Sequence, residues 1–216
     1  MVMIMEIYLV RHGYSQSNAG DNSSDDPALA PLGLTQANCL AERFDTVLLT
    51  GIIVSPLRRT VQTALPTAKE KGLPLLLCHE LLEVDTPETW VCKPLGYMCK
   101  EFDYDNISLL SDGYSPRKED AAARRDRADK VMNLIRENFQ DDDKVLLVTH
   151  GTFLRQLMMA VLDMPRDFDM RFTMTNACVN RVIWSKNEPP RLALMNDTRH
   201  LPLDCISPCG KADIFG

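Results

Sequence analysis

Two histidines of this chain follow apolar runs and precede a glycine. One run ends in Arg11-His12-Gly13 and the other in Thr149-His150-Gly151. A neutral imidazole is a competent nucleophile, and a guanidinium group binds phosphate oxygens through two parallel hydrogen bonds. Two of the four histidines therefore indicate nucleophilic or acid–base catalysis, with Arg11 as a binding group for an anion.

The apolar runs before these histidines are the elements that must position them. Residues 7–10 and 145–149 are rich in strand formers without polar alternation, which is typical of central strands in a parallel sheet covered on both faces. Ligands of such sheets bind beyond the carboxyl ends of the strands. We therefore expect His12 and His150 to face one crevice, where the glycine after each lets a ligand approach the backbone.

The stretch from Ser55 to Ala64 places two arginines at the start of a predicted helix. Ser55 is a suitable N-cap and Pro56 a suitable first helical residue. Arg58 and Arg59 then lie at the positive end of the helix dipole, which favours a bound anion as compensation. Because adjacent helical residues point about 100° apart, we expect one arginine to face the crevice and the other to face solvent.

These groups favour phosphoryl transfer through a covalent histidine intermediate, with arginines holding the phosphoryl oxygens. A metal-dependent hydrolase is the competing class of enzyme. The sequence has no His-Glu-x-x-His motif and no dense cluster of aspartate and histidine. We therefore expect neither a metal nor a cofactor.

Composition limits the other classes of function. The chain has 216 residues, of which 45% are hydrophobic, and this predicts one domain with insertions. A net charge of −6 disfavours nucleic acid as a partner. No long apolar run and no leader pattern occur, so we expect no membrane partner and a cytoplasmic location. The seven cysteines are expected to be reduced thiols; Cys205 and Cys209 could form a metal clip or a bridge, but a loose tail is favoured.

Strand-like and helical patterns alternate along the chain, which is typical of βαβ units. The predicted strands cover residues 3–10, 52–55, 75–78, 144–149 and 176–184, with 192–195 as an edge strand, and the helices begin near Thr35, Pro56, Glu119 and Thr152. We predict a three-layer α/β/α sandwich around a mostly parallel sheet. A single catalytic domain would span residues 1–201, with an irregular inserted lid at about 84–118 and a C-terminal tail at 202–216.

Several segments resemble, in the right order, the motifs of the histidine phosphatase superfamily, the phosphoglycerate mutase-like enzymes. They are Leu9–Asn18, Leu32-Gly33 with Gln36-Ala37, Ser55–Arg59 with Gln62–Ala64, Val148–Gly151, Asn176-Ala177 and Asn196–Leu201. The resemblance covers residues 3 to 201. Each motif alone is weak, whereas the ordered set is specific.

The resemblance implies a metal-independent phosphatase without a cofactor that acts on a small-molecule phosphomonoester. His12 would be the nucleophile and become phosphohistidine. Arg11, Asn18, Arg59 and His150 would bind the phosphoryl group, and His150 would also donate a hydrogen bond to it. Two alternatives stay open, namely phosphoglycerate mutase-type transfer and a phospho-ligand binding module without turnover. A homodimer is left open as well.

In the branch of the family whose second histidine precedes glycine, the resemblance implies a glutamate after the third strand as proton donor to the leaving alcohol. Glu83 fits this position best, and Glu80, Asp85 and Glu88 are the alternatives. Ala30 departs from the family pattern, which has a hydroxyl residue there. No glycine-rich stretch follows Glu83, so the wall that faces the substrate is the least transferable part.

The predicted lid is acidic, with eight acidic and four basic side chains between residues 84 and 120. Mutases of the family carry a basic insertion here, so the charge favours a phosphatase acting on a small or partly aromatic monophosphate. The alternative is a solvated acidic face over a small aromatic core. Arg124, one turn before the apolar stripe of the next helix, would reach the pocket or stay at the surface. His200 is interpreted as structural.

Overall fold

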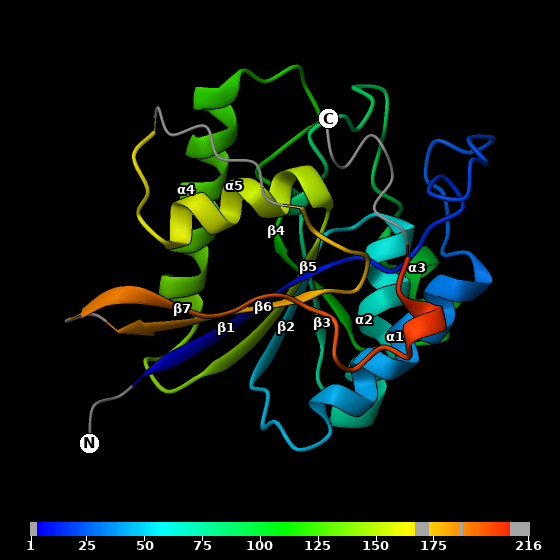
Figure 1. Cartoon of the computed structure of the whole chain (residues 1–216). Coiled ribbons are helices and arrows are strands. Elements are labelled where there is room, and N and C mark those ends of the chain that lie inside the picture. The colour runs from blue at the N-terminus through cyan, green and yellow to red at the C-terminus, as the bar shows by residue number, and fades with distance from the viewer. Residues whose placement is uncertain (1–3, 167–172, 186–187, 208–216) are drawn as a thin grey trace.

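The computed structural model describes residues 4–166, 173–185 and 188–207. A central sheet lies between two layers of helices (Figure 1). In chain order the elements are β1 (Met5–Arg11), α1 (Pro31–Phe44), β2 (Gly51–Val54), α2 (Arg58–Lys71), β3 (Leu75–Cys78), α3 (Leu95–Phe102), β4 (Ile107–Ser111), α4 (Ala121–Asn138), β5 (Lys144–Thr149), α5 (Gly151–Val161), β6 (Val179–Ser185) and β7 (Glu188–Asp197), with single 3₁₀ turns at His79–Leu81 and Leu203–Cys205. The predicted α/β/α sandwich is confirmed.

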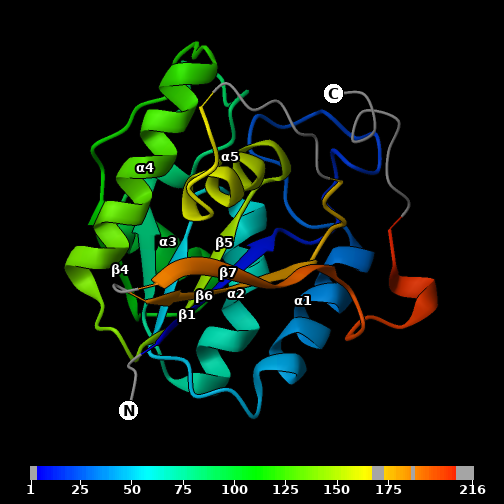
Figure 2. The same cartoon turned by 60° about the vertical axis from the view of Figure 1, so that its left-hand side comes forward.

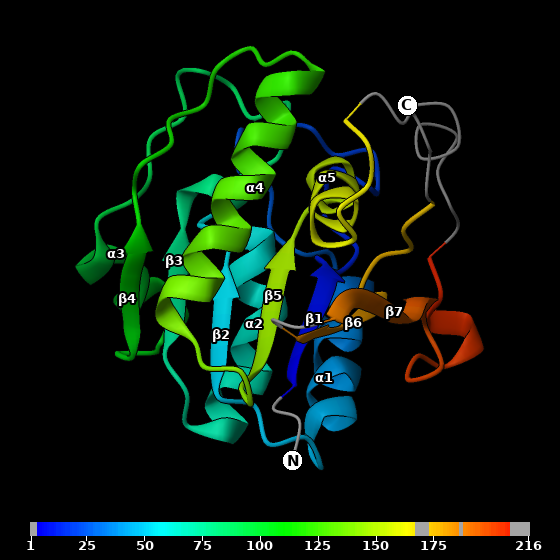
Figure 3. The same cartoon turned by 90° about the vertical axis from the view of Figure 1, so that its left-hand side faces the viewer.

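The sheet has seven strands in the order β4-β3-β2-β5-β1-β6-β7 (Figure 3). The strands from β4 to β1 in this order are parallel, whereas β6 is antiparallel to β1 and β7 is antiparallel to β6. Strands β2, β3 and β4 lie beyond β5 on one side of the β5–β1 pair, and β6 and β7 lie beyond β1 on the other side. The carboxyl ends of β5 and β1 therefore form the switch point at which open α/β sheets bind ligands.

Each face of the sheet has its own apolar core, because side chains alternate along a strand. Ile7 and Leu9 of β1 lie in the core beneath α4 and α5, and Tyr8 and Val10 lie in the core beneath α1 and α2. Figures 1 and 2 show these helix pairs on opposite faces. In the part of the chain that the structure describes, no helix combines the length and apolar character of a membrane span.

Two helices begin away from their predicted positions. α1 begins at Pro31 and not near Thr35, because proline suits the first helical position, where its missing N–H is not needed. α2 begins at Arg58, with Leu57 as the N-cap residue and no side-chain cap of its own. The prediction that Ser55 caps this helix is wrong.

The segment predicted to be irregular contains α3 and β4, so that prediction is wrong for these residues. β4 pairs in parallel with β3, with Ile107 opposite Leu75, and thereby forms one edge of the main sheet. Met98 and Phe102 of α3 pack into the core shared with α1 and α2. Both elements are short, with eight residues in α3 and five in β4, so packing rather than local pattern specifies them. The strand predicted at 192–195 also extends further, from 188 to 197.

Gly33 lets α1 lie against the loop that follows β1. A Cβ at this position would overlap the Tyr14 carbonyl oxygen, whereas a Cβ at Gly96 in α3 would have nothing within 4 Å. We expect Gly33→Ala to lower the free energy of unfolding by about 2 kcal/mol or more through overpacking. Gly96→Ala should raise it by about 0.5 kcal/mol through helix propensity. Urea denaturation followed by circular dichroism measures both changes, and equal effects would contradict this account of Gly33.

Candidate active site

The pairing of β1 with β5 brings the two predicted histidines together. Arg11 is opposite Thr149 in the register of these strands, and the His12 amide donates to the Thr149 carbonyl over 2.9 Å. The imidazole centroids of His12 and His150 are 5.2 Å apart, with the rings tilted by 58°. Both residues are buried. The two side chains expected at one crevice therefore share one site.

The hydrogen bonding of His12 fixes which of its nitrogens is reactive. Nδ1 lies 2.7 Å from the Gly13 carbonyl oxygen. Because a carbonyl only accepts, Nδ1 carries the proton and Nε2 of the neutral ring keeps a free lone pair. Burial, and then the charges of Arg59 and Arg11, hold the pKa of His12 well below its usual value. The ring is therefore neutral near pH 7, as a nucleophile must be.

His150 is held by Ser55, the residue that was predicted from the sequence to cap α2. Ser55 Oγ lies 2.8 Å from Nε2 of His150, so Ser55 orients this ring. Nδ1 of His150 is buried and has no hydrogen-bond partner among the described residues. Burial, followed by the charge of Arg59, lowers the pKa of His150 well below its usual value. A neutral imidazole thus keeps one ring nitrogen available to a bound group.

Arg11 is buried beside the histidines. Its Nη1 donates to the Met174 carbonyl over 2.5 Å. Gly151 makes room for the guanidinium group, since a Cβ there would lie 3.2 Å from Nε of Arg11. The glycine after the second histidine therefore makes room for the guanidinium group of Arg11.

Only one of the two arginines at the start of α2 faces the histidines. Arg59 lowers the pKa of both rings, and burial lowers the pKa of its own guanidinium group. Arg58 is exposed and forms an ion pair with Glu101 of α3. Thr63, one turn after Arg59, donates to the Arg59 carbonyl over 2.6 Å and accepts from the Gly13 amide over 2.9 Å. This threonine ties the start of α2 to the end of β1.

Asn18 is joined to the backbone of His12. Its Oδ1 accepts from the Ser15 amide over 3.1 Å, from the Ser15 hydroxyl over 3.0 Å and from Nδ2 of Asn176 over 3.1 Å. The same Asn176 nitrogen donates to the His12 carbonyl over 3.1 Å. With its oxygen fixed in this way, Asn18 keeps its amide nitrogen as a donor for a bound anion.

Glu83 contacts the N-terminus of α5, the helix that begins directly after His150. Its Oε1 accepts from the Phe153 amide over 3.1 Å and its Oε2 from the Thr152 amide over 3.3 Å. The charge of Glu83 also raises the pKa of Arg59 against the effect of burial. This carboxyl is therefore close to the end of β5, which carries His150, and to Arg59 at the start of α2.

The other three acidic candidates lie elsewhere. Glu80 is buried and binds Nζ of Lys130 at 2.6 Å and Oγ of Ser111 at 2.8 Å. Asp85 is exposed, and exposed Glu88 accepts from a backbone amide of the lid segment. No described contact brings any of these three to the histidine pair.

Arg127 clamps the loop that carries Glu83, and the sequence analysis missed it. Its guanidinium group pairs with Glu119 at 2.6 Å, and both side chains are buried. Nη1 donates to the carbonyls of Glu80 and Leu82 over 2.9 and 2.7 Å, and the group lies 3.9 Å from the ring centroid of Phe153. The clamp therefore holds both the loop before Glu83 and the helix turn that binds its carboxyl.

The sequence does carry a signal for this clamp. Arg127 lies next to buried Ala128, on the face of α4 that packs against the sheet. A buried arginine requires an anionic partner, and Glu119 stands just before the helix. Arg124, the arginine singled out from the sequence, lies one turn earlier in α4, and no described contact brings it to the histidines.

The N-terminus of α2, predicted to bind phosphate, is occupied by a carboxylate. Oδ1 of Asp26 accepts from the Arg58 amide over 3.0 Å. Burial raises the pKa of Asp26, while this hydrogen bond and the nearby Arg59 and Arg58 lower it. Asp26 lies in an irregular loop, 32 residues before Arg58, so no local pattern could have predicted this contact.

The described residues contain no group of three or more histidine, cysteine, aspartate or glutamate side chains that could hold a metal ion. Cys205 is a free thiol, and Cys209 lies outside the described residues. The C-terminal segment is attached as far as it is described, because Gln36 of α1 donates to the Cys205 carbonyl over 2.7 Å and Ser207 donates to Asn176 over 2.9 Å.

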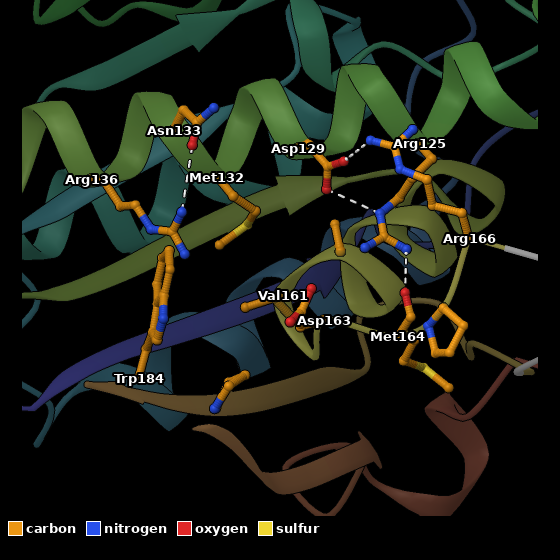
Figure 4. A pocket seen from close by; sticks show the side chains of 13 residues that line it. Arg125, Asp129, Met132, Asn133, Arg136, Val161, Asp163, Met164, Arg166 and Trp184 are labelled. Carbon is orange, nitrogen blue, oxygen red and sulfur yellow. Dashed lines mark hydrogen bonds and ion pairs between the residues drawn. The ribbon is translucent and has the colours of Figure 1, made fainter. Parts of the chain in front are cut away.

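A separate cleft of about 690 Å³ lies between α4, the end of α5 and β6 (Figure 4). Two of its arginines, Arg125 and Arg166, bind the carboxylate of Asp129 at 3.0 and 2.7 Å, and Arg136 stacks on Trp184. Neither histidine of the pair lines it. Its cationic groups are already engaged with side chains of the protein, so the reactive groups remain those at the ends of β1 and β5.

Residues 7–198 match the family model of the histidine phosphatase superfamily, branch 1. The chain belongs to this superfamily. The sequence resemblance is therefore confirmed, and the protein is an enzyme of the histidine phosphatase superfamily. The match contains both strand ends that carry the histidines.

Curated relatives and solved structures of similar proteins carry the names of both mutases and phosphatases. The chain is 31% identical over 218 residues to "Probable phosphoglycerate mutase GpmB" of Yersinia enterocolitica, covering 94% of this chain and 98% of the relative. The protein of that name in Enterobacter sp. is 29% identical over 195 residues, covering 88% and 89%.

Two phosphatase structures share the superfamily fold with this chain. Mycobacterial glucosyl-3-phosphoglycerate phosphatase matches with a TM-score of 0.65 and 22% identity over 90% of this chain and all of that chain. Phosphoserine phosphatase of Entamoeba histolytica, in complex with 3-phosphoglyceric acid, matches with a TM-score of 0.65 and 22% identity over 92% of this chain and all of that chain.

The buried histidines make stability depend on pH. Burial lowers the pKa of His200 to about 4, and those of His12 and His150 are also lowered, whereas unfolded histidine titrates near about 6.5. The unfolded chain therefore binds protons that the folded protein does not. We expect the free energy of unfolding to fall as the pH is lowered below about 6.5, with the His200 contribution lost by about pH 4. Urea denaturation at several pH values measures this, and His200→Asn should flatten the slope; a rise on acidification would contradict it.

Removing one member of the Arg127–Glu119 pair leaves the other charge buried and unpaired. We expect Arg127→Met to lower the free energy of unfolding by about 3 kcal/mol or more, and Arg127→Met with Glu119→Leu to recover about half of that loss. Arg166→Met, which removes two exposed ion pairs, should change the free energy of unfolding by less than about 0.5 kcal/mol. Activity should stay low in the double variant, because the loop before Glu83 has lost the hydrogen bonds that Arg127 donates to it. Full recovery of activity would show that Arg127 does not position this loop.

Proposed function

We propose that the protein hydrolyses small-molecule phosphomonoesters without a metal, through a phosphohistidine on His12. The observation that carries this proposal is the hydrogen bond from Nδ1 of His12 to the Gly13 carbonyl over 2.7 Å. It leaves Nε2 unprotonated within a site that Arg11 and Arg59 make positive. An anionic phosphoryl group compensates those charges, and the lone pair of Nε2 attacks its phosphorus atom.

In the first step a bond forms between Nε2 of His12 and phosphorus while the ester P–O bond breaks. The departing alkoxide takes a proton from the Glu83 carboxyl group, which the N-terminus of α5 orients. The two arginines, the amide nitrogen of Asn18 and the free ring nitrogen of His150 bind the three other phosphoryl oxygens. Water then attacks phosphorus, Glu83 takes its proton, and His12 and inorganic phosphate are released.

Phosphoglycerate mutase activity is the second candidate, because the curated relatives carry that name. A mutase returns the phosphoryl group to its substrate and must keep water from the phosphohistidine. The acidic segment between residues 84 and 120 opposes retention of a doubly phosphorylated intermediate. Isomerisation of 3-phosphoglycerate, assayed against release of phosphate, separates the two: isomerisation faster than release would establish the mutase.

The phosphohistidine is tested directly with His12→Ala. We expect phenyl phosphate hydrolysis to fall by about 10⁴-fold or more, because the covalent route is lost. Wild type mixed with ³²P-labelled substrate and quenched should carry an acid-labile label that His12→Ala lacks. EDTA should leave the wild-type rate unchanged. Undiminished turnover in His12→Ala would overturn the mechanism.

An arginine variant with a matched control tests the phosphate site. Arg59→Met should lower kcat/KM by about 10²-fold or more, because a half-buried donor to the phosphoryl oxygens is lost. Arg166→Met, in the separate cleft, should leave kcat/KM within about twofold of wild type. Equal losses would show that the effect of Arg59 is general and not tied to phosphate.

A further inference from the structure

A hollow of about 480 Å³ opens beside the start of α2. Three segments form its walls, namely the loop after β1, the first turn of α2 and the segment before and within α3. Its lining residues are Ser24, Asp25, Asp26, Arg58, Thr89, Trp90, Val91, Lys93, Tyr97 and Glu101. It thus combines two aromatic side chains with three acidic and two basic groups.

The hollow is connected to the start of α2 and to the segment that carries Glu83. Arg58 in its wall is the residue before Arg59, and Asp26 in its wall interacts electrostatically with Arg59. Trp90 packs against the cluster of Leu57, Leu82 and Tyr114, and Leu57 and Leu82 directly precede Arg58 and Glu83. In a displacement at phosphorus the leaving group departs opposite the nucleophile, towards the group that protonates it.

The cations of the hollow are already engaged within the protein. Arg58 pairs with Glu101, and Nζ of Lys93 lies 5.7 Å from the ring centroid of Tyr97. Asp25 and Asp26 are in no ion pair among the described residues. Oδ1 of Asp26 is held by the Arg58 amide, which leaves Oδ2 as an acceptor in a half-buried wall.

We propose that this hollow binds the leaving group of the substrate and selects phosphomonoesters of ring-bearing alcohols or phenols that are uncharged or cationic away from the phosphate. The proposal rests on the proposed hydrolytic function. Trp90 and Tyr97 offer faces to a ring, and a cation gains from both the aromatic rings and the two aspartates. A carboxylate in the same place meets Asp25 and Asp26, neither of which is in an ion pair among the described residues, so the hollow disfavours phosphoglycerate-like leaving groups.

Two matched esters test the selection by charge. We compare 4-(aminomethyl)phenyl phosphate with 4-carboxyphenyl phosphate, which differ mainly in the sign of the remote charge, and use phenyl phosphate as reference. We expect kcat/KM to favour the cationic ester by about tenfold or more. Asp26→Asn should reduce this ratio to about threefold or less, whereas Asp21→Asn, outside the hollow, should leave it unchanged. A ratio of one, or a preference for the carboxylate, would overturn the proposal.

Selection by the ring is tested with Trp90→Leu. We expect KM for phenyl phosphate to rise by about fivefold or more while KM for methyl phosphate stays within about twofold, because only the first leaving group has a ring to stack. Equal changes for the two esters would overturn this part. A fold defect is recognised because it lowers the rate with methyl phosphate as well.

A binding measurement keeps the inference testable if turnover itself is absent. Calorimetric titration of both charged esters into His12→Ala requires no chemistry. We expect the cationic ester to bind about tenfold more tightly or better. Tighter or equal binding of the carboxylate overturns the leaving-group proposal, whereas loss of phenyl phosphate hydrolysis in wild type overturns only the proposed function.

Discussion

The parallel pairing of β1 with β5 is the constraint on which the rest of the site depends. It sets Arg11 opposite Thr149 and ties the His12 amide to the Thr149 carbonyl, so neither histidine can shift along its strand without the other. The end of β5 also anchors the loop that carries Glu83, since Oγ1 of Thr149 donates to the Leu81 carbonyl over 2.8 Å. One register therefore fixes the two imidazoles and the loop of Glu83. A slip by one residue would turn every side chain of the strand to the other face of the sheet.

The electrostatics of the site follow from what is buried there. Burial and the neighbouring arginines keep the pKa of His12 and of His150 low, so the imidazoles add no charge and the guanidinium groups remain. Arg59 is itself partly desolvated, which lowers its pKa. A buried cluster of this sign is costly without an anion. In the proposed mechanism, selectivity for a phosphoryl dianion and reactivity of the neutral His12 therefore have the same physical origin.

The sequence predicted those parts of the molecule that local pattern determines. The apolar runs before His12 and His150 gave the two central strands, because a strand buried on both faces leaves a continuous apolar signal. Contacts between distant segments left no such signal. The contact of Asp26 with the first turn of α2 and the contact of Ser55 with His150 depend on which loops and strand ends meet in space. For the same reason β4 could not be predicted from the sequence, because this five-residue strand forms only where β3 offers an edge to pair with.

The two helix N-termini nearest the histidines are both occupied by carboxylates. Asp26 accepts from the first amide of α2, and Glu83 accepts from two amides of α5. The first amide of the backbone site that the sequence analysis assigned to phosphate is therefore already engaged on α2. In the proposed mechanism, recognition of the phosphoryl group then falls to side chains, whose guanidinium groups donate two parallel hydrogen bonds to phosphate oxygens. The two hydrogen bonds from α5 also orient the carboxyl of Glu83, the proposed proton donor, before any substrate arrives.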